Sequence, residues 1–204
     1  LWGSPFTDIN AHLMVVADGS IAVASAYGVG PGDSVAPYMA KLDPADGSII
    51  WSGMYGPRGG ESALFSLTQE PASGDLVAVG NVTLLGRYWG TLLRTSDSGD
   101  SLWMRHYQYV DEQVPNGQGI LRDVQCTPDG GFIAVGSALS VPGVYTQDVW
   151  VIKVDSMGCL EPGCHLITGI ESQVTNLQGA LTVAPNPVRS GEAVQVSISL
   201  PPSI

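Results

Sequence analysis

Cys159 and Cys164 are the residues whose type and spacing most clearly allow chemistry. The segment between them contains a Pro-Gly pair, which favours a tight turn. Such a turn can bring the two Cα atoms within disulfide range. The alternative is zinc, with His165 adjacent, but this cluster lacks a second ligand pair at the usual spacing. We therefore expect a disulfide, which implies an oxidising compartment, and we expect Cys126 to be free and buried.

Two acidic turns are the next candidates, because carboxylates bind calcium. Asp43 and Asp46 lie in one turn, and Asp97 and Asp100 lie in the other. A calcium loop needs several more oxygen ligands at fixed spacing, which these turns lack. Solvated hairpin turns explain them better, so the sequence predicts no metal and no cofactor.

The remaining titratable residues form no catalytic motif. His12, His106 and His165 share no pattern with a serine or cysteine nucleophile. Glycoside cleavage of the sialidase type needs an arginine cluster and a tyrosine nucleophile with a glutamate. The candidate arginines sit at unrelated points of the chain; they are Arg58, Arg87, Arg94, Arg105 and Arg122. We therefore predict no catalytic residue.

Composition restricts the class of protein further. The 204 residues carry a formal net charge of −11 and include 26 glycines, which is typical of turn-rich β structure. No basic stripe exists to displace counterions from a nucleic acid. No apolar run approaches the roughly 20 residues that span a bilayer, and the first residues do not resemble a signal peptide.

A repeat of strand patterns organises the chain. The segments DGSIAVAS (18–25), SGDLVAVG (73–80) and DGGFIAVG (129–136) align, with Gly19, Gly74 and Gly130 lying 55 and 56 residues apart. Each unit has strand candidates before and after this segment, and a fourth strand follows an acidic turn in the first two units. Four strands per unit predict the blades of a β-propeller. We place the units at 9–54, 62–108 and 120–168, the strands of the third lying within 120–154.

Tryptophans recur at one position of the repeat. Trp51 and Trp103 fall in the fourth strand of their units, and Trp2 has the same register relative to the first unit. We expect these side chains to pack between adjacent blades. Leu1-Trp2 then ends a preceding blade. The third unit ends in Cys159 and Cys164 where the others have a tryptophan, as expected of a last blade.

The C-terminal residues carry a family resemblance. APNPVRSGEAVQVSI resembles the start of the C-terminal sorting domain of Bacteroidetes proteins exported by type IX secretion, with Pro185, Asn186 and Pro187 as its opening turn. GCLEPGC resembles the close of the last repeat in secreted propeller-like proteins of the same bacteria, and TPDGGFIAVG and DVWVIKVD resemble their repeats. The resemblance implies contact with the type IX secretion machinery and an extracellular or cell-surface location. A complete sorting domain has more strands, and Leu1-Trp2 is only the end of a blade, so we expect a chain that is truncated at both ends or only partly represented.

Two shorter resemblances concern the turns of the repeat. KLDPADGSIIW resembles the tryptophan-docking repeat of quinoprotein-type propellers, and RTSDSGDSLW resembles the aspartate box of sialidase-like propellers. Both motifs are structural in those families. Three Asp-Ser-apolar sites resemble the O-glycosylation motif of exported Bacteroidetes proteins; their serines are Ser34, Ser101 and Ser156. Asn81-Val82-Thr83 matches an N-linked acceptor only formally.

The sequence thus predicts an all-β protein with four-stranded antiparallel propeller-type blades in 1–168, a linker in 169–184 and the start of a small β-sandwich-like sorting domain in 185–204. The strand at 193–200 is expected to pack with later strands of its own domain or with a partner; the alternative is that it completes the third blade by pairing with 148–154. We expect a secreted binding or structural protein without catalytic activity, whose partners include surface glycans or other surface proteins. The alternative is an accessory propeller part of a secreted glycosidase or peptidase.

Overall fold

The structure is a computed structural model that describes the greater part of the chain. It describes residues 9–30, 35–58, 60–109, 117–139, 147–164, 181–184 and 195–198, with the backbone alone for 9–11, 139 and the last two ranges. Several sequence predictions fall outside these residues, namely those for Trp2, Ser34, His165 and the Pro185-Asn186-Pro187 motif.

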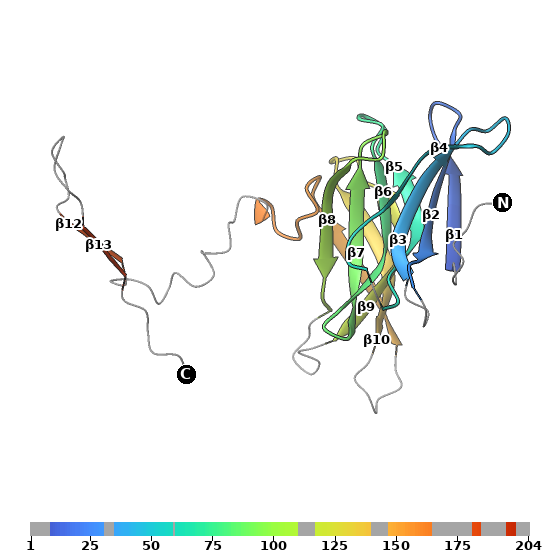
Figure 1. Ribbon diagram of the computed structural model, residues 1–204. Helices are drawn as coiled ribbons and strands as arrows, with labels where there is room; N and C mark the ends of the chain where they lie inside the picture. The colour runs from blue at the N-terminus through green and yellow to red at the C-terminus, as the bar shows by residue number, and fades with distance from the viewer. Residues whose placement is uncertain are drawn as a thin grey trace. The chain divides into compact units, whose positions relative to one another are not determined.

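Three antiparallel sheets follow one another along the chain (Figure 1). The first contains β1 (Ile9–Val15), β2 (Ile21–Gly28), β3 (Val35–Leu42) and β4 (Ile49–Met54). The second contains β5 (Ala63–Gln69), β6 (Leu76–Leu84), β7 (Arg87–Thr95) and β8 (Ser101–Tyr107). The third contains β9 (Gln118–Cys126), β10 (Phe132–Leu139) and β11 (Gln147–Val154). The predicted order of three consecutive units, the last one incomplete, is therefore confirmed, and every regular element in the described residues is a strand.

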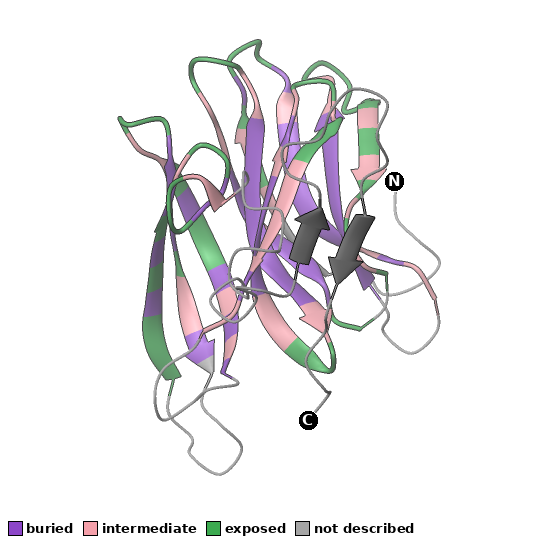
Figure 2. Cartoon of the chain, turned by 90° about the vertical axis from the view of Figure 1, so that its left-hand side faces the viewer, coloured by how far each residue is buried: buried purple, intermediate pink, exposed green. Residues whose placement is uncertain are grey.

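The sheets pack face to face, with their first strands adjacent. β1 contacts β5, and β5 contacts β9, so these three inner strands lie side by side. One apolar core fills the space between the first and second sheets, and another fills the space between the second and third. Figure 2 shows buried residues concentrated along the strands and exposed residues at the turns.

Strand alternation explains why a single sheet contributes to two cores. In β6, Leu76 and Ala78 belong to the core with the first sheet, whereas Val77 and Val79 belong to the core with the third. Successive side chains of a strand point to opposite faces, so an unbroken apolar run satisfies both sides. The glycine turns predicted from the repeat precede these runs, with φ near +80° at Gly74 and Gly130.

A pair of aromatic side chains joins each of the first two sheets to the next. Trp51 Nε1 donates to the carbonyl of Asp97 at 2.9 Å, and Tyr55 Oη donates to the carbonyl of Gly99 at 2.7 Å. Tyr107 Oη repeats this bond on the Gly158 carbonyl at 2.7 Å. The tryptophans therefore lie at inter-sheet positions, each with a tyrosine four residues later that the sequence analysis did not single out.

Glycine is required where these tryptophans meet the turns. A Cβ atom at Gly99 would lie 2.8 Å from the Trp51 ring, and one at Gly158 would lie 2.9 Å from the Trp103 ring. Both glycines also have positive φ, which disfavours other residues.

The basic residue that precedes each acidic turn ties neighbouring turns together. Lys41 is buried and pairs with Asp18 in its own sheet at 2.9 Å and with Asp97 in the second sheet at 2.6 Å. Burial opposes its charge, but the hydrogen bonds to Asp97 and Asp18 outweigh that effect and raise the pKa of Lys41. Arg94 holds the equivalent position, pairing with Asp75 in its own sheet and donating to the Ser156 carbonyl of the third-sheet turn.

One face of the third sheet is exposed, whereas the equivalent faces of the first and second sheets are buried. Three repeat positions are fully buried in the first sheet as Ala22, Ala24 and Met39, and again in the second as Val77, Val79 and Leu92. In the third sheet they are Ile133, Val135 and Val151, which are 41%, 38% and 54% exposed. Within the described residues, nothing covers this face.

The cysteines behave largely as the sequence predicts. Cys159 and Cys164 form a disulfide, so the thiolates that the zinc alternative needs are not present. Cys126 is a free thiol, but it is half-buried where full burial was expected. The reason is its place in β9, beside Thr68 and the Gln69 carbonyl of the neighbouring inner strand.

The C-terminal unit, residues 163–204, contains a two-stranded sheet of its own. β12 (Leu181–Ala184) pairs antiparallel with β13 (Gln195–Ile198). Two expectations are corrected here. β12 lies inside the predicted linker 169–184, because four residues are too few for their alternation to stand out. β13 pairs with this earlier strand, where the sequence favoured later strands or, alternatively, the third sheet.

Candidate binding pocket on the inner strands

A β-bulge interrupts each inner strand, and in the second and third sheets it lies at the same repeat position. Pairing skips one residue between Ile9 and Ala11, between Leu64 and Ser66, and opposite the Val135–Gly136 step. The extra residues are Asn10, Phe65 and Arg122. A bulge leaves its residue out of the ladder and re-aims the side chain, and such bulges are common beside functional sites.

Glycine on the neighbouring strand makes room for two of these bulges. A Cβ at Gly80 would lie 1.8 Å from the Ala63 carbonyl oxygen, and one at Gly136 would lie 1.9 Å from that of Ile120. The obstructing atoms are backbone and cannot move aside without breaking the sheet. The repeated glycine of the VAVG and IAVG segments is therefore tied to the bulge.

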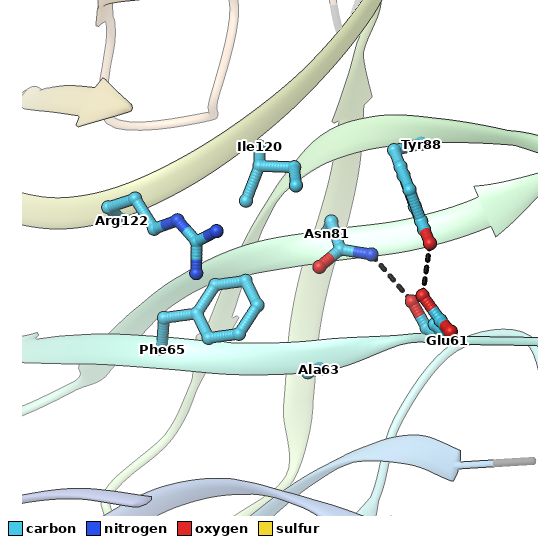
Figure 3. A pocket seen from close by; sticks show the side chains of 7 residues that line it. All are labelled: Glu61, Ala63, Phe65, Asn81, Tyr88, Ile120 and Arg122. Atoms are coloured by element: carbon cyan, nitrogen blue, oxygen red, sulfur yellow. Dashed lines mark hydrogen bonds between the residues drawn. The ribbon is translucent and has the colours of Figure 1, made fainter. Parts of the chain in front are cut away.

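The second and third bulges bring Phe65 and Arg122 into contact. The guanidinium carbon of Arg122 lies 4.4 Å from the centre of the Phe65 ring. Stacking of this kind holds the planar guanidinium against the ring face by a cation–π attraction. Figure 3 shows the two side chains at one end of a pocket between β5 and β9.

Glu61 lies at the other end and is held firmly through its backbone. Its carbonyl accepts hydrogen bonds from Asn81 Nδ2 at 2.6 Å and from Thr83 Oγ1 at 3.3 Å. Residue 61 also bridges to Val35 of the first sheet. Gly60 precedes it with φ +68°, and a Cβ there would lie 2.8 Å from that of Thr83. These constraints fix the position from which the carboxylate extends.

The Glu61 carboxylate accepts a hydrogen bond from the Tyr88 hydroxyl (Figure 3). This bond raises the pKa of Tyr88 to about 12, with burial and the charge of Glu61 adding to the effect. The phenol therefore stays protonated at neutral pH. As a hydrogen-bond donor, it orients the Glu61 carboxylate. Tyr88 is itself positioned by its backbone N–H, which donates to Gln118 Oε1 at 3.0 Å.

Asn81 lies between the two ends and offers an open acceptor. The residue is only 3% exposed, and its amide nitrogen is used on the Glu61 carbonyl. Its amide oxygen has no donor among the described residues and points into the pocket (Figure 3). An acceptor held on a pocket wall in this way can receive a hydrogen bond from a ligand.

Together these side chains line a cavity of about 210 Å³, which Ala63 and Ile120 complete. The cavity combines an acceptor amide, a carboxylate, a phenol, a guanidinium and an aromatic face. This combination of a few fixed polar groups on an apolar wall is typical of small-molecule sites. Its size suits one small polar ligand.

Of the residues that the sequence analysis discussed, Asn81 and Arg122 line the pocket. Of the five candidate arginines only Arg122 lines it, so it holds no arginine cluster. The acidic turns serve the hairpins: Asp43 and Asp46 accept from nearby backbone N–H groups, and Asp97 pairs with Lys41. No group of three metal-ligating side chains occurs in the part of the chain that the structure describes. Ser101 and Ser156 are exposed, and their modification stays a prediction.

His12 and His106 lie on β1 and β8. His12 Nδ1 accepts from the backbone N–H of Leu67 at 3.2 Å and so links β1 to β5. His106 contacts Thr91, and burial lowers the pKa of His106. Neither lines the pocket.

Comparison with known proteins identifies the fold. No family model matches the chain, and no curated protein matches its sequence. A crystal structure of a thermostable family-43 glycoside hydrolase is similar, with a TM-score of 0.50 and 10% identity over 75% of this chain. The fold is all-β and of the β-propeller type. The match covers 56% of the hydrolase chain, and at this identity it concerns the fold alone.

In a propeller-type fold the inner strands surround the centre, so the pocket lies on the inner side of the second and third blades. The equivalence of Phe65 and Arg122 appears only in the strand registers, because the 56-residue spacing of the repeat places Phe65 opposite Leu121. Glu61, Asn81 and Tyr88 gave no signal, because their meeting depends on how loops return to the sheet. The described residues contain no helix long and apolar enough to cross a membrane.

Proposed function

We propose that this chain is a secreted, non-catalytic binding protein that holds a carbohydrate in the inner-strand pocket. The observation that carries the proposal is the open amide oxygen of the buried Asn81, placed between a fixed carboxylate and a free guanidinium. Sugar hydroxyls donate and accept at once, so one sugar ring can satisfy all three groups. The Phe65 and Ile120 side chains offer apolar surface for the C–H groups of the ring.

The carboxylate inventory of the pocket favours binding over hydrolysis. Glycoside hydrolysis normally uses two carboxyl groups about 5–9.5 Å apart, one acting as the acid and one as the base or nucleophile. Glu61 is the one carboxylate among the residues that line the cavity, and it is already hydrogen-bonded to a protonated phenol. This supports a site that positions a ligand.

Titration of the whole chain with a panel of mono- and oligosaccharides tests the proposal by calorimetry. Glu61→Gln keeps the shape of the side chain and removes its charge, so we expect sugar affinity to fall about tenfold, as for loss of a charged hydrogen bond. Glu161→Gln makes the same charge change at an exposed residue outside the pocket and should leave affinity unchanged. Failure of every sugar to bind, or equal losses in both variants, would refute the proposal.

The second candidate is an accessory propeller part of a secreted hydrolase. The likeness to the fold of a glycoside hydrolase favours it. The full open reading frame separates the two: a catalytic domain elsewhere in it would support the accessory role, whereas further repeats alone would support a binding protein. In both cases the pocket is expected to bind sugar, so the calorimetry stands independently.

Export by type IX secretion rests on the resemblance of APNPVRSGEAVQVSI to a sorting domain. Expression of the natural gene, with and without its C-terminal sorting segment, in a bacterium that has this system tests it. We expect the protein at the cell surface or in the medium only when the segment is present. Equal export of both forms would contradict this part of the proposal.

A further inference from the structure

The Arg122 guanidinium has neither a carboxylate nor a carbonyl partner among the described residues. Lys41 pairs with Asp18 and Asp97, Arg94 with Asp75, and Lys153 with Asp129. No ion pair or protein hydrogen bond to Arg122 occurs among the described residues, and its one strong contact is the Phe65 ring. Arg105 also lacks an ion pair, but it donates to the Met157 carbonyl, whereas the donors of Arg122 stay available.

Stacking on Phe65 keeps the donors of this guanidinium available. A guanidinium that lies over a ring uses its flat face for that contact, whereas its five N–H groups point outward in its own plane. Those N–H groups form a rigid fork that matches a carboxylate through two parallel hydrogen bonds. Because Arg122 extends from a bulge, it can turn toward the pocket without disturbing the ladder of β9.

The two ends of the pocket therefore differ in the hydrogen-bonding groups that they offer (Figure 3). The Arg122 end offers donors, whereas the Asn81 oxygen and the Glu61 carboxylate offer acceptors. The acceptor end would repel an anion, so a ligand that fits must carry its negative group at one end and hydroxyl donors at the other. A simple anion such as phosphate satisfies only half of the site.

We propose that the ligand is an acidic sugar, whose carboxylate pairs with Arg122 and whose hydroxyls donate to Asn81 and Glu61. This inference rests on the proposed function and narrows its substrate class. A sugar ring separates a carboxylate on one carbon from hydroxyls on the opposite side, as the pocket requires. The net charge of the protein opposes anionic polymers at long range, so recognition depends on the short-range fork.

Calorimetry with matched probes tests the inference on the whole chain. Glucuronic and galacturonic acids are compared with their methyl esters, which keep the ring and hydroxyls but lose the charge, and with glucose and galactose. We expect at least one acid to bind about tenfold more tightly than its ester, the difference expected of a charge-assisted bidentate pair. Raising the salt concentration should weaken binding of the acid and leave binding of the ester unchanged.

Arg122→Gln is the decisive variant, since it should make the acid and the ester bind equally. Arg58→Gln is its control, because Arg58 is exposed, lies outside the pocket and loses the same charge. Thermal melting checks that both variants fold. If acid and ester bind wild-type protein equally, or neutral sugars alone bind, the inference is wrong while carbohydrate binding stands. If no sugar binds, the proposed function itself fails.

Discussion

Single glycines decide where this protein can place a functional side chain. At Gly80 and Gly136 the limiting contact is with a carbonyl oxygen of the bulged strand. A methyl group there would clash with the backbone that forms the bulge, which cannot move aside as a flexible side chain can. The residues that position Phe65 and Arg122 therefore lie on a different strand from the side chains themselves.

Gly80→Ala tests this dependence. We expect it to destabilise the protein by about 3 kcal/mol or more, the upper range for overpacking, because the Ala63 carbonyl must move. Gly30→Ala is the matched control, since a Cβ at Gly30 meets no atom within 4 Å and its φ is not positive. It should be neutral or slightly stabilising. Chemical denaturation measures both, and equal effects would show that the bulge tolerates a side chain.

The elements that join the sheets are turns, and their stability depends on charge. The Ser20 hydroxyl and Lys41 hold the pKa of Asp18 well below its usual range, the hydroxyl contributing most. Lys153 and Thr127 do the same for Asp129 in the third sheet. Hydrogen bonds from Ser73 and Ala72 lower the pKa of Glu70. These carboxylates stabilise the folded state above the pKa values of the unfolded chain, and that stability is lost as they protonate.

The melting temperature should consequently be level above about pH 5 and fall progressively below about pH 4, where unfolded carboxyl groups take up protons. Asp18→Asn should lower the melting temperature at pH 7 and reduce the acid dependence, because it removes one of the depressed groups. Asp148→Asn, at an exposed carboxyl on β11, should leave the melting temperature at pH 7 unchanged. Calorimetric scans from pH 2.5 to 7 measure this, and identical profiles for Asp18→Asn and wild type would contradict the account.

The sequence predicts those elements whose signals are local or periodic. Turn glycines, alternating runs and the 55-residue spacing are local or periodic, so the three units could be placed closely from sequence. A bulge adds one residue to a strand whose letters still resemble a strand, as in ALFSLTQ, so the pocket could not be predicted. Tyr55 and Tyr107 could have been, because each follows a repeat tryptophan by four residues. β12 was missed because it is so short.

At the scale of the whole repeat region, the three sheets differ in how far their outward faces are buried. The first and second sheets each bury an outward face under their successor, whereas Ile133, Val135 and Val151 of the third remain open. Apolar side chains gathered on one exposed sheet face are a larger liability than the same residues scattered singly. The cost of a polar group at this repeat position should therefore depend on the sheet that carries it.

Val79→Thr and Val135→Thr compare one repeat position in its covered and open settings. Val79 is fully buried, so an added hydroxyl without a partner should cost roughly 1–3 kcal/mol. Val135 is 38% exposed, so the same change should stay within about 0.5 kcal/mol. Urea denaturation of the whole chain measures the difference. A loss at Val135 as large as that at Val79 would mean that this face is covered in solution.

The bulges described on the inner strands also bear on how such a protein can diversify. A bulge residue lies outside the hydrogen-bonded ladder, so its identity is free of the pairing constraints on its neighbours. Each repeat thus contributes one variable residue to a shared recognition surface. Randomising Phe65 and Arg122 while keeping Gly80 and Gly136 would give a combinatorial library on an unchanged scaffold. Duplication of such repeats followed by drift at a single codon could yield new specificities without passing through misfolded intermediates.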